Sequence, residues 1–111
     1  MLNQSATAVV ARNERWSGPS ACEPYEAGWA YEAVVFVRAL GIEGPLACEA
    51  RIQISADGFN WVDEGTRFAL PNAEGAVSFA RVSHFGNWLR VAADIPADRA
   101  ITLICTWHVK G

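Results

Sequence analysis

Apolar and polar residues alternate along most of this chain with the period of two residues that is typical of β-strands. Residues 46–55 show the pattern most clearly. One face carries Leu46, Cys48, Ala50, Ile52 and Ile54, and the other carries Ala47, Glu49, Arg51, Gln53 and Ser55. This pattern predicts a half-buried antiparallel strand with one solvated face.

Residues 29–40 form the longest predicted strand, and they are apolar on both faces. One face carries Tyr31, Ala33, Val35, Val37 and Ala39, and the other carries Glu32, Val34, Phe36, Arg38 and Leu40. A strand with two apolar faces is expected in the centre of a sheet, where one face packs on the sandwich core. We expect the second face to be covered by the N-terminal arm or by another subunit.

Further strands are predicted at 6–11, 59–63, 66–70, 76–82, 87–93 and 100–109, separated by turns rich in Gly, Pro, Asn and Asp. The last strand should point Ile101, Leu103, Cys105, Trp107 and Val109 inward. Residues 13–25 are rich in turn formers and are predicted to be surface loop. Helix formers gather only at 21–31, where Pro24 and Gly28 interrupt them.

Short strands joined by short turns predict an all-β fold, a single antiparallel β-sandwich with jelly-roll-like winding, seven or eight strands and no substantial helix. The length of 111 residues fits one domain. Within it we expect residues 1–28 to form an N-terminal arm with an edge strand and a loop, and residues 29–111 to form the β-sandwich.

Composition narrows the classes of partner. The net charge is −3 and the nine basic residues are scattered, so nucleic acid is not expected. No apolar run reaches membrane-spanning length, and residues 1–10 lack the pattern of a signal peptide. Eight of the nine basic residues are Arg, which suits fixed ion pairs and protein contacts, or reflects GC-rich coding. The three cysteines lack CxxC spacing, and Cys48 and Cys105 are expected to be buried free thiols.

Catalytic and metal-binding patterns are not evident in the sequence. The two histidines, His84 and His108, have no metal-ligand spacing, and Ser83 does not lie in a nucleophile elbow. The acidic loop residues Asp57, Asp63, Glu64, Asp94 and Asp98 show no calcium-loop spacing. The sequence therefore predicts a protein that is not an enzyme and that needs no cofactor or metal.

A tight turn at Asp57-Gly58 joins two alternating runs and predicts a β-hairpin. Ser55 and Asp57 are expected to bond the backbone of the turn, because their short polar side chains do so in Asx and Ser turns. Gly58 should supply a positive φ, and Trp61 should hold the returning strand on the sandwich. These four residues are predicted to have a structural role.

Four aromatic residues lie in or beside predicted loops. They are Trp16, Trp29, Phe59 and Phe85. Aromatic rings at such positions cover a core, anchor a protein interface or stack on a sugar. The sequence leaves all three roles open for each of them.

The pattern Ser55-x-Asp57-Gly58-x-x-Trp61 resembles a hairpin of discoidin-like domains, the C-terminal type of coagulation factors 5 and 8. Residues 85–91 also resemble that family's penultimate strand, and 101–109 its closing strand. The resemblance implies a jelly-roll sandwich whose loops bind glycans or lipid headgroups.

The layout also resembles small β-sandwich structural proteins encoded among the head and tail genes of tailed phages. Residues 55–63 and the strand Trp88-Leu89-Arg90-Val91 provide the match, which spans about residues 29–110. This resemblance implies a non-enzymatic assembly protein, a subunit or decoration of a virion or phage-like particle. Its expected partners are copies of itself or a larger protein assembly, without nucleic acid or membrane. The alternative is a carbohydrate-binding discoidin-like module, for which the partner is a glycan.

Overall fold

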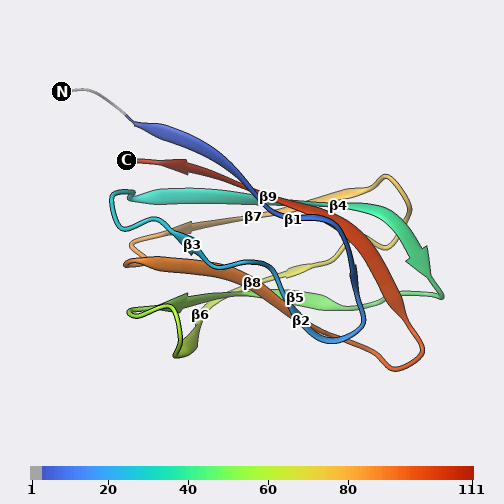
Figure 1. Ribbon diagram of the computed structural model, residues 1–111. Coiled ribbons are helices and arrows are strands. Elements are labelled where there is room, and N and C mark those ends of the chain that lie inside the picture. Colours follow the sequence, from blue (N-terminus) through green and yellow to red (C-terminus); the bar gives the residue numbers. More distant parts are fainter. Residues whose placement is uncertain (1–3) are drawn as a thin grey trace.

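Two antiparallel sheets pack face to face in the computed structural model, which describes residues 4–111 (Figure 1). Within these residues the chain forms strands and turns and no helix. The strands are β1 (Ser5–Trp16), β2 (Gly18–Ala21), β3 (Tyr25–Glu26), β4 (Glu32–Glu43), β5 (Glu49–Ser55), β6 (Trp61–Ala69), β7 (Val77–Ser83), β8 (Trp88–Ile95) and β9 (Ala100–Lys110). The predicted all-β class is confirmed.

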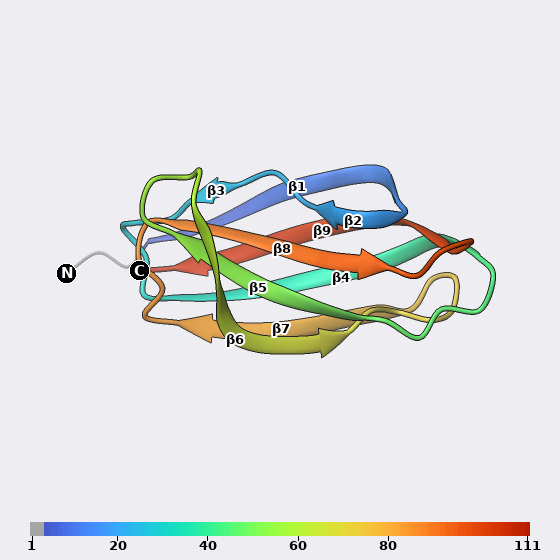
Figure 2. The ribbon, with the colours of Figure 1, turned by 90° about the horizontal axis from the view of Figure 1, so that it is seen from below.

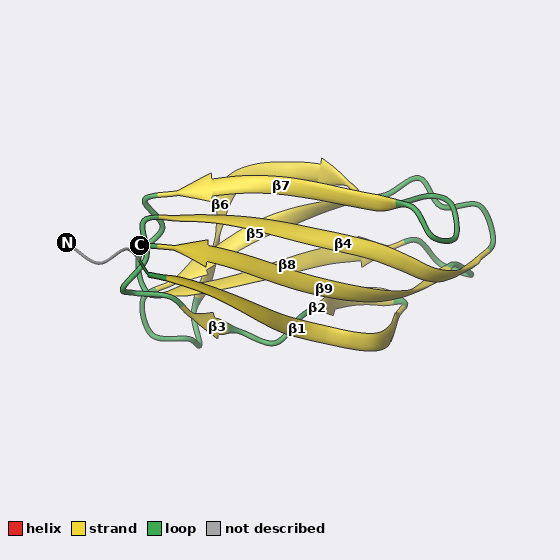
Figure 3. Ribbon diagram, turned by 90° about the horizontal axis from the view of Figure 1, so that it is seen from above, coloured by secondary structure: helices red, strands yellow, loops and turns green. Residues whose placement is uncertain are grey.

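The first sheet has the order β1-β9-β4-β7, and the second has the order β2-β8-β5-β6 (Figure 3). Strand β3 also pairs with β8, so β2 and β3 are two parts of one interrupted strand. The first strand therefore pairs with the last, β2 with β8, β4 with β7, and β5 with β6. This is the winding of a jelly roll. The predicted jelly-roll sandwich is confirmed, and residues 4–111 form nine strands, or eight when β2 and β3 count as one.

The core lies between the sheets and is filled by the inward residues of the long strands. The five residues of β9 that the alternation assigns to the core are fully buried: Ile101, Leu103, Cys105, Trp107 and Val109. Opposite them, β5 and β8 contribute Ala50, Ile52, Leu89 and Val91. Residues one apart on these strands point to opposite faces, so the sequence period directly sets which side chains fill the core. Trp107 Nε1 is buried without a hydrogen-bond partner among the described residues.

The N-terminal segment is more ordered than the sequence pattern predicts. Strand β1 is an edge strand of the first sheet, and its residues Val10, Ala11 and Trp16 are in the core. Two register shifts between Val9 and Glu14 let this strand follow β9 over its whole length. Residues 1–3 of the predicted arm lie outside the described residues.

The prediction of surface loop over residues 13–25 is wrong for the end of β1 and for β2. The turn formers there sit on edge strands, which tolerate them. Pro19 pairs with Asp94 and lies on β2, the edge strand of the second sheet. Proline has no backbone N–H, and an edge strand tolerates this because no further strand needs that donor. Gly18 has a φ of 63° and makes the sharp turn from β1 into β2.

The three cysteines are free thiols in different surroundings. Cys22 and Cys105 are buried, and the thiol contact with Cys105 is the main cause that lowers the pKa of Cys22. That contact and burial raise the pKa of Cys105. Cys48, which the sequence pattern places in the core, is only partly buried, and its Sγ lies 3.3 Å from the Asp94 carbonyl oxygen. The sandwich therefore holds two inaccessible thiols and one near the surface.

The connecting loops gather at the two ends of an elongated body of 48 × 27 × 20 Å (Figure 2). The loops around residues 27–31, 56–60 and 84–87 lie at the same end as the C-terminus (Figures 2 and 3). Gln4 and Gly111 also meet there, joined by two backbone hydrogen bonds of 3.0 and 3.2 Å. None of residues 4–111 belongs to a helix long and apolar enough to cross a bilayer.

Candidate functional site

The outer surface of the first sheet carries apolar side chains on all four of its strands. We call this surface the outer apolar face; its members are Val9, Val34, Phe36, Leu40, Val77, Phe79 and Ile104. The register sets Val9 against Thr106, Thr106 against Phe36, and Phe36 against Phe79, so one row crosses the whole sheet. Phe36, Phe79 and Val77 are 37%, 50% and 55% exposed. Such side chains form an apolar patch rather than isolated exposed residues.

Aromatic contacts fix the centre of the outer apolar face. The rings of Phe36 and Phe79 lie 6.1 Å apart, and the His108 ring meets Phe36 edge-on at 5.3 Å. The Arg81 guanidinium lies 5.1 Å above the ring of Phe79. Offset and edge-on aromatic pairs are stabilising, as is a cation over a ring. The exposed rings are therefore held in place before any partner binds.

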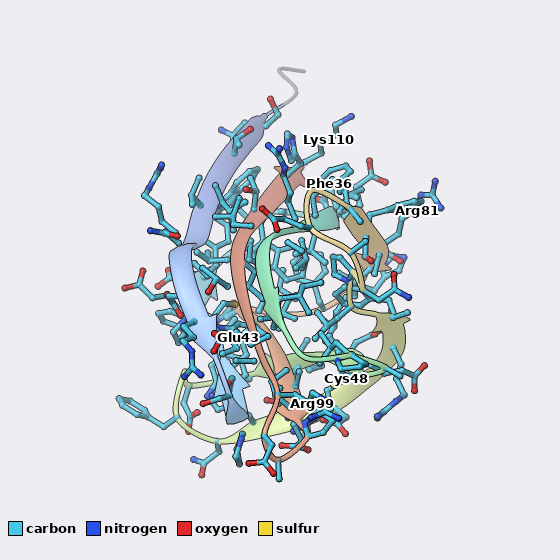
Figure 4. All side chains as sticks on the ribbon, turned by 90° about the vertical axis from the view of Figure 1, so that its right-hand side faces the viewer. Phe36, Glu43, Cys48, Arg81, Arg99 and Lys110 are labelled. Carbon is cyan, nitrogen blue, oxygen red and sulfur yellow. The ribbon has the colours of Figure 1, made fainter. Side chains whose placement is uncertain are left out.

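Four charged residues surround this aromatic centre: Glu32, Arg38, Arg81 and Lys110. None of them forms a salt bridge with another residue between Gln4 and Gly111. In Figure 4, Phe36 and Lys110 lie on the side of the first sheet that faces away from the second sheet. A groove of about 840 Å³ runs beside Phe36 and Arg81 and reaches Glu64 on β6. At the other end of the sheet, beyond the bulge at Ala39–Gly41, Arg15 Nε and Glu43 Oε2 pair at 2.8 Å.

The outer surface of the second sheet has a different character, because Arg51 and Arg67 on it form salt bridges with acidic residues of the same chain. Arg51 bridges Asp63 at 3.4 Å and Asp94 at 3.2 Å. Arg67 lies 3.4 Å from Glu49. This surface matches the solvated face that the alternation predicts for residues 46–55. The two outer surfaces therefore differ: the first sheet exposes the rings of Phe36 and Phe79, whereas on the second sheet the ring of Trp61 is only partly exposed and is stacked under Arg90.

The sequence leaves open whether the N-terminal arm or another subunit covers the second face of β4. The described part of the arm does not cover it, because β1 joins the edge of the same sheet through β9. The outer apolar face is thus uncovered by residues 4–111. The sequence pattern predicts Phe36 as a member of this face, whereas Phe79 is not among the loop aromatics that the sequence marks as possible contacts. The alternation of Val77, Phe79 and Arg81 with Ser78 and Ala80 is the signal that marks it.

The hairpin turn between β5 and β6 is closed by the side chains of Ser55 and Asp57. Ser55 Oγ accepts hydrogen bonds from the backbone N–H groups of Asp57 and Gly58, at 3.3 and 2.9 Å, and donates to Asp57 Oδ1 at 2.9 Å. Asp57 Oδ1 accepts from the N–H groups of Phe59 and Asn60, both at 2.9 Å. These bonds satisfy the backbone N–H groups of the turn, which would otherwise have no hydrogen-bond acceptor.

Trp61 lies on the outer surface of the second sheet and is partly buried. The Arg90 guanidinium stacks 4.4 Å from its ring centroid, and Arg90 Nε donates to Gln53 Oε1 at 2.7 Å. This stacking links β6 to β8 over the outer surface of β5, and the Trp61 ring does not enter the core. The contacts of Ser55, Asp57 and Trp61 are thus made with the turn itself and with the neighbouring strands.

We expect Gly58→Val to destabilise the protein by about 1–3 kcal/mol, because a β-branched residue is strained at positive φ. Gly58 has a φ of 82°, and a Cβ added there would lie 3.2 Å from the Trp88 ring. Urea denaturation would measure the loss. Gly41→Val is the matched control, because a Cβ at Gly41 meets nothing within 4 Å. Equal stability of the two variants would contradict the role of Gly58.

The Asp57 carboxylate predicts a pH dependence. Its hydrogen bonds, chiefly from the backbone of Asn60 and then Phe59, hold the pKa of Asp57 far below its usual range. The unfolded chain binds a proton near its ordinary pKa of about 3.9. A depressed folded-state pKa gives stability that is complete above that value and is lost as the pH falls below it. Asp57→Asn should therefore be less stable than the native chain near neutral pH, and the gap should narrow below about pH 4. Thermal melts across that range would show a constant gap if the charge were unimportant.

The four loop aromatics separate into two classes. Trp16 and Phe85 are buried, with exposed fractions of 2% and 3%, so they are core residues and are not available as contacts in the folded chain. Trp29 and Phe59 are exposed, at 40% and 86%. A groove of about 580 Å³ lies between the 55–60 and 85–87 turns and is lined by Asn60, the chain neighbour of Phe59, and by Val62 and Asn87.

The histidines lie apart from one another. His84 is in the turn after β7 with a φ of 56°, and His108 is on the outer apolar face against Phe36. Within residues 4–111, no three His, Cys, Asp or Glu side chains are grouped as metal ligands would be.

Comparison with known proteins connects the fold to one solved phage-derived structure. Neither a protein-family model nor a curated protein matches the chain. The crystal structure of the SPBc2 prophage-derived protein YomS is similar over 100% of this chain and 96% of that chain, with a TM-score of 0.59 and 8% identity. A structure of the Gx strain of infectious bursal disease virus aligns with 97% of this chain and 32% of its own, with a TM-score of 0.49 and 11% identity.

The likeness to YomS shows a shared β-sandwich fold. The viral structure is too distant to add to that conclusion. Neither structure is described as a discoidin domain, so that resemblance remains a hypothesis from the hairpin motif.

Proposed function

We propose that this protein is a non-enzymatic structural subunit of a phage or phage-like particle, and that the outer apolar face is its contact with neighbouring subunits. The observation that supports this most is the exposed aromatic row of Phe36 and Phe79, set among charges that have no salt-bridge partner in residues 4–111. The fold shared with a prophage-derived protein supports the particle context.

The physics of the outer apolar face favours protein contact. Apolar area removed from water contributes roughly 25 cal/mol per Å², and large exposed patches on soluble proteins are commonly interaction sites. Aromatic residues and Arg are enriched in interfaces, whose rims are polar. The outer apolar face has this composition, with Phe36 and Phe79 central and Arg38, Arg81 and Lys110 around them. Burial of these rings against a neighbour would stabilise an assembly.

Sedimentation velocity of the purified chain over a wide concentration range tests the proposal. We expect association that Phe36→Asp abolishes, because a carboxylate at the centre of the outer apolar face would lose its hydration among apolar side chains. Phe59→Asp is the matched control: Phe59 is also an exposed ring, but it lies on the β5–β6 turn. A stable monomer at all concentrations, or equal effects of the two variants, would count against the proposed contact.

A second candidate is a carbohydrate-binding module of the discoidin type. The groove between the 55–60 and 85–87 turns favours it, because Asn60 and Asn87 offer hydrogen bonds next to an apolar wall, and the exposed Phe59 precedes Asn60 in the chain. Sugar-binding sites combine an aromatic ring with such polar groups. Affinity gels with immobilised glycans test this function. Absence of retardation, or retardation unchanged by Phe59→Ala, would remove it.

A further inference from the structure

We propose that the outer apolar face forms a two-fold symmetric homodimer in which Glu32 of each protomer pairs with Arg38 of the other. The inference rests on the proposed function, which makes this face a contact, and it adds the identity of the neighbour and the orientation of the contact. It is argued from the order of charges along β4 and from the register of the strands beside it.

The outward residues of β4 are arranged so that two copies complement each other. In order they are Glu32, Val34, Phe36 and Arg38. A two-fold axis that lies in the interface, perpendicular to the strand and between Val34 and Phe36, reverses this order in the partner. Glu32 then faces the partner's Arg38, and Val34 faces the partner's Phe36. Opposite charges meet twice, and a large side chain meets a smaller one twice.

The same two-fold axis also places complementary residues of β7 and β9 against each other. Arg81 is in register with Val34, and Phe79 with Phe36, so the axis sets Arg81 against the partner's Phe79. The Arg81 guanidinium already lies 5.1 Å from the ring of Phe79 in its own chain, and the dimer would place it between two rings. On β9, the same operation sets Lys110 against the partner's Ile104, where the aliphatic stem of lysine covers an apolar side chain.

The alternative two-fold orientation is unfavourable. An axis parallel to the strands and over β4 would place Glu32 against the partner's Glu32 and Arg38 against the partner's Arg38. Like charges across an interface cost several kcal/mol and exclude wrong orientations. Among arrangements that stack β4 on the partner's β4, the charge pattern therefore selects the antiparallel one, with the small rotation that twisted sheets adopt when they stack.

The size of the surface is sufficient for a specific contact. Four strands spaced about 4.8 Å apart and crossed by about four outward rows give each copy roughly 500 Å² of projected area. Two copies together bury roughly 1,000 Å², which is the lower range of specific interfaces. This predicts a dimer of moderate affinity that the repeated contacts of an assembly would reinforce.

Charge exchange tests the orientation. We expect Glu32→Arg and Arg38→Glu each to weaken dimerisation by roughly tenfold or more, and the double variant to restore it, because the pairs are then reversed but complete. Sedimentation equilibrium measures the three dissociation constants. The control pair is Glu49→Arg with Arg67→Glu, which exchanges an ion pair on the outer surface of the second sheet and should leave dimerisation unchanged. Glu32 and Arg38 are exposed, so the variants should melt like the native chain.

The outcomes separate this inference from the proposed function. Dimerisation that each single variant weakens and that the double variant restores supports the dimer. Association that Phe36→Asp abolishes, but that the double variant does not restore, overturns the dimer geometry and leaves the proposed contact face standing. A chain that stays monomeric at all concentrations overturns the dimer and counts against the proposed function as well.

Discussion

Aspartate in place of Val37 is expected to prevent folding, whereas aspartate in place of Phe36, one residue earlier, should leave the sandwich intact. Val37 is fully buried on a central strand, between Ser78 of β7 and Cys105 of β9. A carboxylate there has no partner and loses its hydration, which costs several kcal/mol. A domain of this size has a total stability of only about 5–15 kcal/mol. Phe36 points to the opposite side of the same sheet, where water can hydrate the charge in the monomer.

Circular dichroism and the yield of soluble protein measure the effect of Val37→Asp, and sedimentation measures that of Phe36→Asp. The Phe36 variant should keep the native spectrum and lose self-association. A folded Val37 variant would show that the inward face of β4 is misassigned. An unfolded Phe36 variant would show that the outer apolar face is part of the folding core rather than a contact surface.

Trp107→Ala is expected to lower the free energy of unfolding by about 3–5 kcal/mol, because it leaves a large cavity between the sheets. Trp107 is fully buried on β9. Trp107→Phe should cost less, since it keeps most of the volume and removes the Nε1–H group that lacks a partner. Chemical denaturation followed by fluorescence of the remaining tryptophans would give both values. Phe59→Ala, a truncation of an exposed ring, should change the free energy by about 0.5 kcal/mol or less.

The inverse order, with Trp107→Phe the more damaging variant, would contradict the cavity argument. A loss from Phe59→Ala as large as that from Trp107→Ala would show that the β5–β6 turn is held by its ring. Neither result follows from the contacts described above.

The fold could be predicted from the sequence because a period of two residues identifies both a strand and its inward side. In β9 the alternation from Ile101 to Val109 named the five residues that fill the core. The N-terminal segment was predicted less well, since Gly18 and Pro19 are turn formers by local preference. They lie on an edge strand because β2 pairs with β8, which is far along the chain. Local residue preference carries no information about such a distant pairing.

The candidate site was predicted only in part, for a related reason. The two apolar faces of β4 predicted that Phe36 lies on a face that another element or subunit covers. Whether β1 covers that face or joins the edge of the same sheet depends on tertiary pairing. Loop position left the roles of Trp16 and Phe85 open between core and contact, and both fold into the core. The difference between paired and unpaired charges on the two outer surfaces depends on strand register. Arg51 reaches Asp94, which is remote in sequence, only because β5 and β8 are neighbours.

The pairing of the first strand with the last has a consequence for biosynthesis. Strand β1 leaves the ribosome early, but its hydrogen-bonding partner β9 is translated after all the other strands. Strand β2 waits in the same way for β8, whereas the β5–β6 hairpin can close as soon as its own turn emerges. During elongation the edge of β1 therefore has no native partner, and neighbouring nascent chains on one polysome expose the same edge. The risk that β1 pairs with another nascent chain ends once β9 has been translated and has paired with it.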